Sequence, residues 1–311
     1  SIINRLVGSN VAKVGQGTDV TVEAQIIEWN DLLLVDLPGY GTTKFPKNEY
    51  FETFNVEDFN IYLCVFSGKF HAADTEFFHH LRNNGRVCIF VRNHHDEIWE
   101  DGKSIDDLEK KIIDDVRKQV KSNESVIFTS CRNKKGFDEL STAIETNIDS
   151  ASREKWFKSA KAYSIEFLEK KKNECKNHAI KYAALSAANG INPIIGADIA
   201  VDVGLLVTLF KKIRDSYGLT NEQFELKKQV VQNMAPVVNN IIKYGTKEGV
   251  SMLLKVFAVR EAAKETAKYV PIVGQLIAAT LGFSITMAAA TSYLNDCHMV
   301  AKTILESELA C

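Results

Sequence analysis

The chain has 311 residues, 45% of them hydrophobic and 25% charged, a composition that is ordinary for a globular protein of about two domains. Its formal net charge of -2 supplies no global basic field, so a nucleic-acid partner is not expected. The six cysteines are scattered without a C-x-x-C pair. This excludes a disulfide-rich secreted scaffold and predicts free thiols in a reducing, cytoplasmic compartment.

The first half of the chain alternates between helix-like and strand-like patterns. An apolar segment at residues 2–7 ends at Gly8 and predicts a short helix. Strands are expected at residues 18–27, 31–36, 59–66, 87–92 and 125–129. Helical patterns are expected at residues 74–83, 105–121 and 137–148. This alternation predicts an α/β domain over residues 1–150, with a mostly parallel sheet covered on both faces. The continuous apolar run at 31–36 predicts a strand buried on both sides.

Residues 151–311 carry almost no strand signal and are expected to form an all-helical domain. Residues 153–188 predict one or two helices, and further helices are expected at 193–215, 221–243, 246–268 and 271–308. Thr220 provides capping chemistry for the pattern that starts at residue 221. Asp198 and Asp202 share one helix face, which favours interhelical hydrogen bonds or a basic partner over metal binding.

No residue between 269 and 295 is charged, and this stretch is long enough to span a bilayer. It also contains Gln, Thr, Ser, Pro and Gly, so it is only mildly apolar. We interpret it as the central helix of a bundle, with peripheral membrane insertion and a true span as the alternatives. The lysines between residues 158 and 181 predict a solvated helix face, with contact to anionic lipid as the alternative.

An Asp-x-x-Gly pattern, formed by Asp36 and Gly39, ends the apolar run at 31–36. The carboxylate of Asp36 suits Mg²⁺ bound through water, and the N–H of Gly39 suits the γ-phosphate, as in the switch element of P-loop GTPases. Tyr40 stands where many GTPases have a Gln that orients the attacking water. We therefore expect hydrolysis to be slow or to depend on groups from a partner. Thr18 and Thr21 compete for the role of the switch threonine that reaches Mg²⁺, and Thr21 has the better matched context.

Two more strand ends carry candidate base-binding residues. Asn93, His94 and Asp96 follow the strand at 87–92, where a guanine-specific site has Asn/Thr-Lys-x-Asp. The carboxylate of Asp96 would accept hydrogen bonds from N1 and N2 of guanine, which adenine does not offer. Ser130 and Cys131 follow the strand at 125–129, and their backbone N–H groups would face the guanine O6. Since such strand ends share one crevice in a parallel sheet, the loops are expected to converge on one nucleotide.

The phosphate-binding pattern Gly-x-x-x-x-Gly-Lys-Ser/Thr does not occur where it is needed, directly before the first helix. Residues 1–8 are what normally follows that loop. We therefore expect the loop and the strand before it to precede residue 1, and the chain as given to have negligible nucleotide affinity.

Together these residues resemble the immunity-related GTPase family, a branch of the dynamin-like large GTPases. The most specific match is residues 36–46, where the family shows Asp-Leu-Pro-Gly-x-Gly-Ser/Thr-x-x-Phe-Pro. Residues 1–8, 12–13, 20–23 and 90–96 are similar to further family segments. The motifs cover residues 1–150, whereas the helical half matches only in the type and order of its elements.

The resemblance implies an interferon-inducible protein that binds GTP with Mg²⁺ and hydrolyses it to GDP and phosphate. It also implies self-association through the nucleotide face and action on intracellular membranes in cell-autonomous defence. The candidate GTP-binding residues are Asp36, Gly39, Asn93, His94, Asp96, Ser130 and Cys131. His94 and Tyr40 depart from the family pattern and motivate an alternative, a catalytically degenerate GTPase-like module for membrane binding or assembly. A third hypothesis is that residues 151–311 form a membrane-inserting effector.

Overall fold

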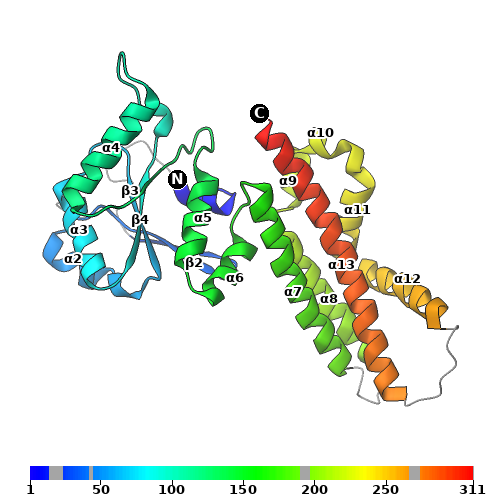
Figure 1. The fold of residues 1–311 in the computed structure, drawn as a ribbon. Helices are drawn as coiled ribbons and strands as arrows, with labels where there is room; N and C mark the ends of the chain where they lie inside the picture. Colours follow the sequence, from blue (N-terminus) through cyan, green and yellow to red (C-terminus); the bar gives the residue numbers. More distant parts are fainter. Residues whose placement is uncertain (14–23, 42–44, 190–196, 266–273, 311) are drawn as a thin grey trace. The chain divides into compact units, whose positions relative to one another are not determined.

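The structure is a computed structural model that describes residues 1–13, 24–41, 45–189, 197–265 and 274–310. The chain divides into two compact units, Ser1–Lys161 and Ala162–Cys311 (Figure 1). Helix α6 (Ser150–Ser159) begins at the boundary expected from the sequence but lies within the first unit. The division between the two units therefore falls after this helix.

The strands of the first unit form two sheets. Strands β1 (Gln25–Trp29) and β2 (Leu32–Asp36) pair antiparallel. Strands β3 (Ile61–Phe66), β4 (Val87–Arg92) and β5 (Val126–Phe128) pair in parallel in that order. The predicted α/β fold with a mostly parallel sheet is confirmed, although the part of the first predicted strand at residues 18–23 lies outside the described residues. The carboxyl ends of β3, β4 and β5 lie at one edge of their sheet because the strands run in the same direction.

Strand β2 is not buried on both faces, so that prediction was wrong. Leu33 is 58% exposed, and Ile26 on the neighbouring strand is 65% exposed. The antiparallel register places Ile26 opposite Val35 and Glu28 opposite Leu33, so these four side chains share one face. Ile27, which points to the other face, is buried. An apolar run alone does not distinguish one covered face from two, and among the described residues only the face of Ile27 is well covered.

Helices cover the parallel sheet on both sides. Besides α6, the helices of the first unit are α1 (Ile2–Val7), α2 (Lys47–Thr53), α3 (Ala72–Asn83), α4 (Ile105–Val120) and α5 (Phe137–Asn147). Phe78 of α3 and Val116 of α4 join Phe90 of β4 in one buried cluster. Figure 1 shows α5 on the opposite side of this sheet from α3 and α4. Gly8 ends α1 in the left-handed conformation with φ of 79°, which confirms the predicted helix stop.

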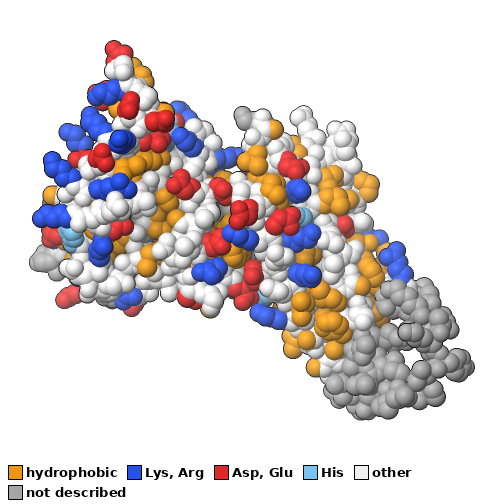
Figure 2. All heavy atoms as spheres, in the orientation of Figure 1, with side chains coloured by type: hydrophobic (Ala, Val, Ile, Leu, Met, Phe, Trp, Pro, Cys, Tyr) orange, Lys and Arg blue, Asp and Glu red, His pale blue; other side chains and the backbone are white. Residues whose placement is uncertain are grey.

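Charged side chains of both signs are interspersed over the face of the first unit drawn in Figure 2. This surface pattern agrees with the small formal net charge of -2. On the visible face, steering of a strongly charged polymer by a large field of one sign is therefore not expected.

The described residues of the second unit form helices and the turns between them, without a strand. Its helices are α7 (Ile165–Asn189), α8 (Ala197–Ser216), α9 (Asn221–Leu226), α10 (Lys228–Val231), α11 (Ala235–Tyr244), α12 (Lys247–Glu265) and α13 (Gly274–Leu309). The sequence predicted one or two helices at 153–188, and the structure has two, α6 and α7. The single helix expected at 221–243 is instead broken into α9, α10 and α11. The hydroxyl of Thr220 accepts a hydrogen bond from the N–H of Gln223, so its predicted capping role is confirmed.

Helix α13 supplies the centre of this unit, as expected for its uncharged stretch. Ala289, Ala290 and Tyr293 are fully buried, and the ring of Tyr293 stacks on Phe210 of α8 with centroids 4.1 Å apart. Among the helices of the described residues, none has the length and apolar character needed to cross a membrane. The side chains of Asp198 and Asp202 lie outside the described part of α8.

Lys171 of α7 is a buried cation in this core, with only 1% of its surface exposed. Its Nζ donates a hydrogen bond of 2.7 Å to the carbonyl of Ser216, the last residue of α8. The carbonyls at a helix C-terminus have no partner within the helix and carry partial negative charge, so they are suited to an ammonium group. Burial nevertheless lowers the pKa of Lys171 from 10.5 to about 8, because leaving water disfavours the charged form.

This shift predicts a specific pH dependence of stability. Between about pH 8 and pH 10.5 the unfolded chain binds the lysine proton more tightly than the folded chain does, so the contribution of Lys171 to the free energy of unfolding rises with pH. This contribution is expected to grow by about 3 kcal/mol over that range, because burial lowers the pKa from 10.5 to about 8 and one pKa unit corresponds to about 1.4 kcal/mol. Urea unfolding between pH 7 and pH 11 measures it, with Lys171→Met expected to remove this component. Lys176→Met, at an exposed position of the same helix, is the matched control; equal pH profiles for both variants would contradict the prediction.

Candidate functional site

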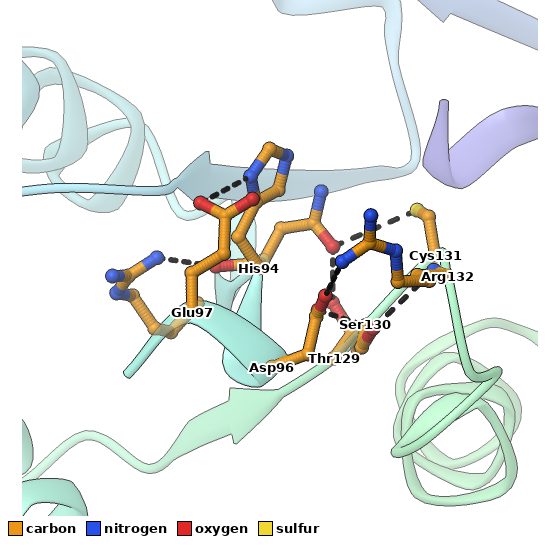
Figure 3. A network of polar contacts seen from close by, with 9 residues as sticks. His94, Asp96, Glu97, Thr129, Ser130, Cys131 and Arg132 are labelled. Atoms are coloured by element: carbon orange, nitrogen blue, oxygen red, sulfur yellow. Dashed lines mark hydrogen bonds and ion pairs between the residues drawn. The ribbon is translucent and has the colours of Figure 1, made fainter. Parts of the chain in front are cut away.

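The loops that follow β4 and β5 are joined by backbone hydrogen bonds at the carboxyl edge of the parallel sheet. The N–H of Asn93 donates to the carbonyl of Phe66 at the end of β3, over 2.9 Å. The N–H of Thr129 donates to Arg92, also over 2.9 Å, and the N–H of His95 donates to Thr129 over 3.0 Å. These bonds continue the ladder beyond the strands, so the side chains that follow each strand are held next to one another (Figure 3).

Asp96 lies at the centre of the polar network on this edge. Its Oδ1 accepts a short hydrogen bond from the hydroxyl of Ser130, and its Oδ2 lies 3.7 Å from Nη1 of Arg132. The hydroxyl of Ser130 holds the pKa of the Asp96 carboxyl below its usual value, with a smaller contribution from the charge of Arg132. The side chain of Asp96 is 18% exposed. The network therefore presents an ionised, oriented carboxylate at the sheet edge.

Asn93 and Cys131 are part of the same network. The Oδ1 of Asn93 accepts hydrogen bonds from Oγ1 of Thr129, at 3.2 Å, and from Sγ of Cys131, at 3.6 Å. Asn93 is buried, so its amide fixes the loop after β5 rather than contacting solvent. The sequence analysis assigned Asn93 and Cys131 to this site, but it did not predict that Thr129 would donate a hydrogen bond to Asn93.

Two of the expected base contacts differ from the sequence prediction. The N–H of Ser130 donates to the carbonyl of Lys135 over 3.1 Å, so in this conformation it does not face a guanine O6. The N–H of Cys131 is then the remaining candidate donor. His94 has a left-handed backbone with φ of 59°, and its Nδ1 lies 3.1 Å from Oε2 of Glu97. The imidazole is thus engaged by its own loop, at the position where the pattern has a lysine.

Asp36 and Gly39 come from the segment that leaves the other sheet, and they are not part of the network in Figure 3. Asp36 is the last residue of β2 and lies opposite Gln25 in the register. Burial, followed by the charge of Asp36, raises the pKa of Tyr50. Thr18 and Thr21 lie outside the described residues. The structure therefore brings together four of the predicted residues, which are Asn93, Asp96, Ser130 and Cys131.

Two further residues position the loop after β5. The Nε of Arg5 on α1 donates to the carbonyl of Cys131 over 2.7 Å, across 126 positions of sequence. Gly136 has φ of 77°, and a Cβ there would lie 1.9 Å from the carbonyl oxygen of Phe128. The roles of Arg5 and Gly136 could not be predicted from the sequence, because each depends on contact with a residue that is distant in the sequence or brought close only by the fold. Arg132 could have been found from its place directly after Ser130 and Cys131.

An α/β unit with polar loops at the carboxyl edge of a parallel sheet is the architecture of a nucleotide- or ligand-binding domain. Comparison with protein families identifies which class of nucleotide-binding protein this is. The family model for interferon-inducible GTPase (IIGP) matches residues 14–308, so the chain belongs to this family. The resemblance drawn from the sequence motifs is thereby confirmed.

Curated relatives agree with this assignment. The chain is 21% identical over 323 aligned residues to interferon-inducible GTPase 5 of Rattus norvegicus, covering 95% of this chain and 70% of the relative. It is 20% identical over 289 residues to interferon-inducible GTPase 5 of Bos taurus, covering 86% of this chain and 62% of the relative. The matched region is thus shorter than either relative.

Gly136 provides a test of the loop geometry. Gly136→Ala is expected to lower the free energy of unfolding by about 3 kcal/mol or more, because the new Cβ collides with backbone and the left-handed φ is strained. Gly102→Ala is the matched control: φ is 71° there, but no atom lies within 4 Å of the new Cβ, so only about 1 kcal/mol is expected. Chemical denaturation of both variants measures the difference. Equal losses would show that α5 does not pack against the end of β5 in this way.

Proposed function

We propose that the first unit binds GTP and hydrolyses it to GDP and phosphate, with Asp96 selecting guanine. Membership of a GTPase family supports a guanine-nucleotide ligand. The observation that carries the residue assignment is the hydrogen bond between Ser130 and the ionised carboxylate of Asp96. A carboxylate accepts hydrogen bonds only, so it pairs with the N1–H and N2–H donors of guanine and is left unsatisfied by adenine.

Arg132 lies beside the carboxylate oxygen that Ser130 does not occupy. Its side chain is 85% exposed, so the 3.7 Å contact with Asp96 is a surface ion pair of small energy. A guanine base can displace it at little cost. Arg132 then remains close enough to lie over the face of the base as a cation–π partner.

Magnesium fits the oxygen donors that the proposal assigns to it. Asp36 ends β2 with a carboxylate, a hard ligand of the kind Mg²⁺ prefers, and would hold the ion through water. Thr21 is the proposed switch threonine, and the N–H of Gly39 would contact the γ-phosphate. When bound, the ion would offset the negative charge that develops on the phosphate oxygens.

The proposed consequences of GTP binding are self-association through the nucleotide face and contact with intracellular membranes from the cytoplasm. They follow from the family resemblance and from the sequence of the helical unit. The first unit would act as the GTPase domain and the second unit as the helical domain that responds to it.

A second candidate is a GTPase-like assembly module without turnover. It is favoured by Tyr40, which stands at the position of the water-orienting glutamine, and by His94, which stands at the lysine position of the guanine-binding pattern. The hydroxyl of Tyr40 hydrogen-bonds to Glu76, and the ring of His94 is held by Glu97. Nucleotide binding without phosphate release, at concentrations where the protein self-associates, would favour this candidate over the GTPase.

Base selection is tested on the chain itself by backbone amide NMR. At millimolar nucleotide with Mg²⁺, GTP should shift the amides of Cys131 and Arg132, whereas ATP should not. In Asp96→Asn the shifts caused by GTP should disappear at the same millimolar concentration, because the variant lacks the hydrogen bonds to a charged acceptor. The same variant should gain binding of xanthosine triphosphate, whose C2 carbonyl accepts from the new amide.

Asp101→Asn removes an exposed carboxylate of the following loop and serves as the control, with GTP shifts expected to match those of the unaltered chain. Equal shifts with ATP and GTP, or an Asp96→Asn variant that binds GTP as well as the unaltered chain, would refute the assignment of Asp96.

A further inference from the structure

The loop after β2 is tied to helix α3 by one carboxylate. Oε1 of Glu76 accepts a hydrogen bond of 3.2 Å from the hydroxyl of Tyr40. Oε2 of the same side chain accepts a short hydrogen bond from Nζ of Lys47, the first residue of α2. Glu76 therefore bridges two residues that flank the loop. We call Tyr40, Lys47 and Glu76 the latch.

Aromatic packing fixes the ring of Tyr40 within this arrangement. The ring meets Tyr50 edge-on, with centroids 5.2 Å apart, and lies 5.3 Å from Phe51 and 5.2 Å from Phe77. The Nζ of Lys47 is 5.9 Å from the centroid of the Tyr40 ring. Tyr50 in turn donates a hydrogen bond from its hydroxyl to the carbonyl of Pro38. The segment from Pro38 to Tyr40 is thus held to α2 and α3 by independent contacts.

The backbone is adapted to the same arrangement at Gly41. Its φ is 71°, which favours glycine, and a Cβ there would lie 3.2 Å from Cγ and Cε of Lys47. The lysine side chain therefore passes close to the glycine backbone on its way to Glu76. The turn, the lysine and the carboxylate form one local structure rather than a chance surface contact.

We propose that Glu76 is a positioning residue of the GTPase, which sets the place of Gly39 by holding Tyr40 against α3. This inference rests on the proposed function, because it is the N–H of Gly39 that is assigned to the γ-phosphate. Gly39 directly precedes Tyr40, so a residue that fixes Tyr40 also limits where that N–H can lie. In this arrangement Tyr40 anchors the loop and does not orient the attacking water.

The latch is tested first without nucleotide, by hydrogen exchange and by NMR of ¹³Cζ-labelled tyrosine. Burial, and then Glu76, raise the pKa of Tyr40. In Glu76→Gln the pKa of Tyr40 should fall toward its ordinary value. The Tyr40→Phe variant identifies the ¹³Cζ resonance of Tyr40 by its absence from the spectrum. Exchange of the amides of residues 39–41 should rise about two- to five-fold, the size expected for losing an exposed ion pair. Glu52→Gln, an exposed carboxylate on α2 that takes no part in the latch, should change neither.

The second measurement compares GTP with GDP binding in the same proteins. Glu76→Gln should reduce the preference for GTP over GDP about two- to five-fold while leaving discrimination against ATP unchanged. Unchanged exchange and an unchanged Tyr40 titration in Glu76→Gln would overturn the latch, even if GTP binds normally. A normal latch response with an unaltered GTP preference would overturn the positioning role. If millimolar guanine nucleotide shifts no amide in either protein, the proposed function fails and the role of Gly39 with it. The exchange and titration results without nucleotide still decide whether the latch exists.

Discussion

The hydrogen bond from Ser130 to the carboxylate of Asp96 is the interaction on which the candidate site depends. It joins loops that follow two neighbouring parallel strands, β4 and β5, and so requires the strands to end at the same edge in the observed register. It also lowers the pKa of the carboxyl group, because the hydroxyl stabilises the charged form. The surrounding structure serves this geometry: Asn93 fixes the loop after β5, Arg5 ties that loop to α1, and Gly136 allows α5 to start against the end of β5.

Much of this was predictable from the sequence, because strand order and strand ends leave local signals. Continuous apolar runs located β3, β4 and β5, and the polar residues directly after them identified Asp96 and Ser130. The burial of β2 was mispredicted because an apolar run reports hydrophobicity and not the number of covered faces. The break of the 221–243 pattern into three helices, and the partners of Arg5 and Gly136, depend on packing between distant segments. No local pattern encodes such contacts.

The sequence shows only that Tyr40 stands where many GTPases have a glutamine. The contacts in the structure indicate what the tyrosine does there. A tyrosine is a poor substitute for a glutamine that orients water. It is well suited to an anchor, because its ring packs in an aromatic cluster while its hydroxyl reaches a carboxylate. The same loop thereby combines an apolar anchor with the proposed phosphate sensor at Gly39. In the helical unit, Lys171 likewise combines burial with a polar contact, because its ammonium group donates a hydrogen bond to a carbonyl at a helix C-terminus.

The most direct test of the central claim is a carboxyl ¹³C titration of Asp96 in the unaltered chain and in Ser130→Ala. The pKa of Asp96 is expected to lie below its usual value in the unaltered chain and to rise when the hydroxyl is removed. An ordinary pKa for Asp96 that is the same in both proteins would contradict the claim, because the two loops would then not be joined through this hydrogen bond.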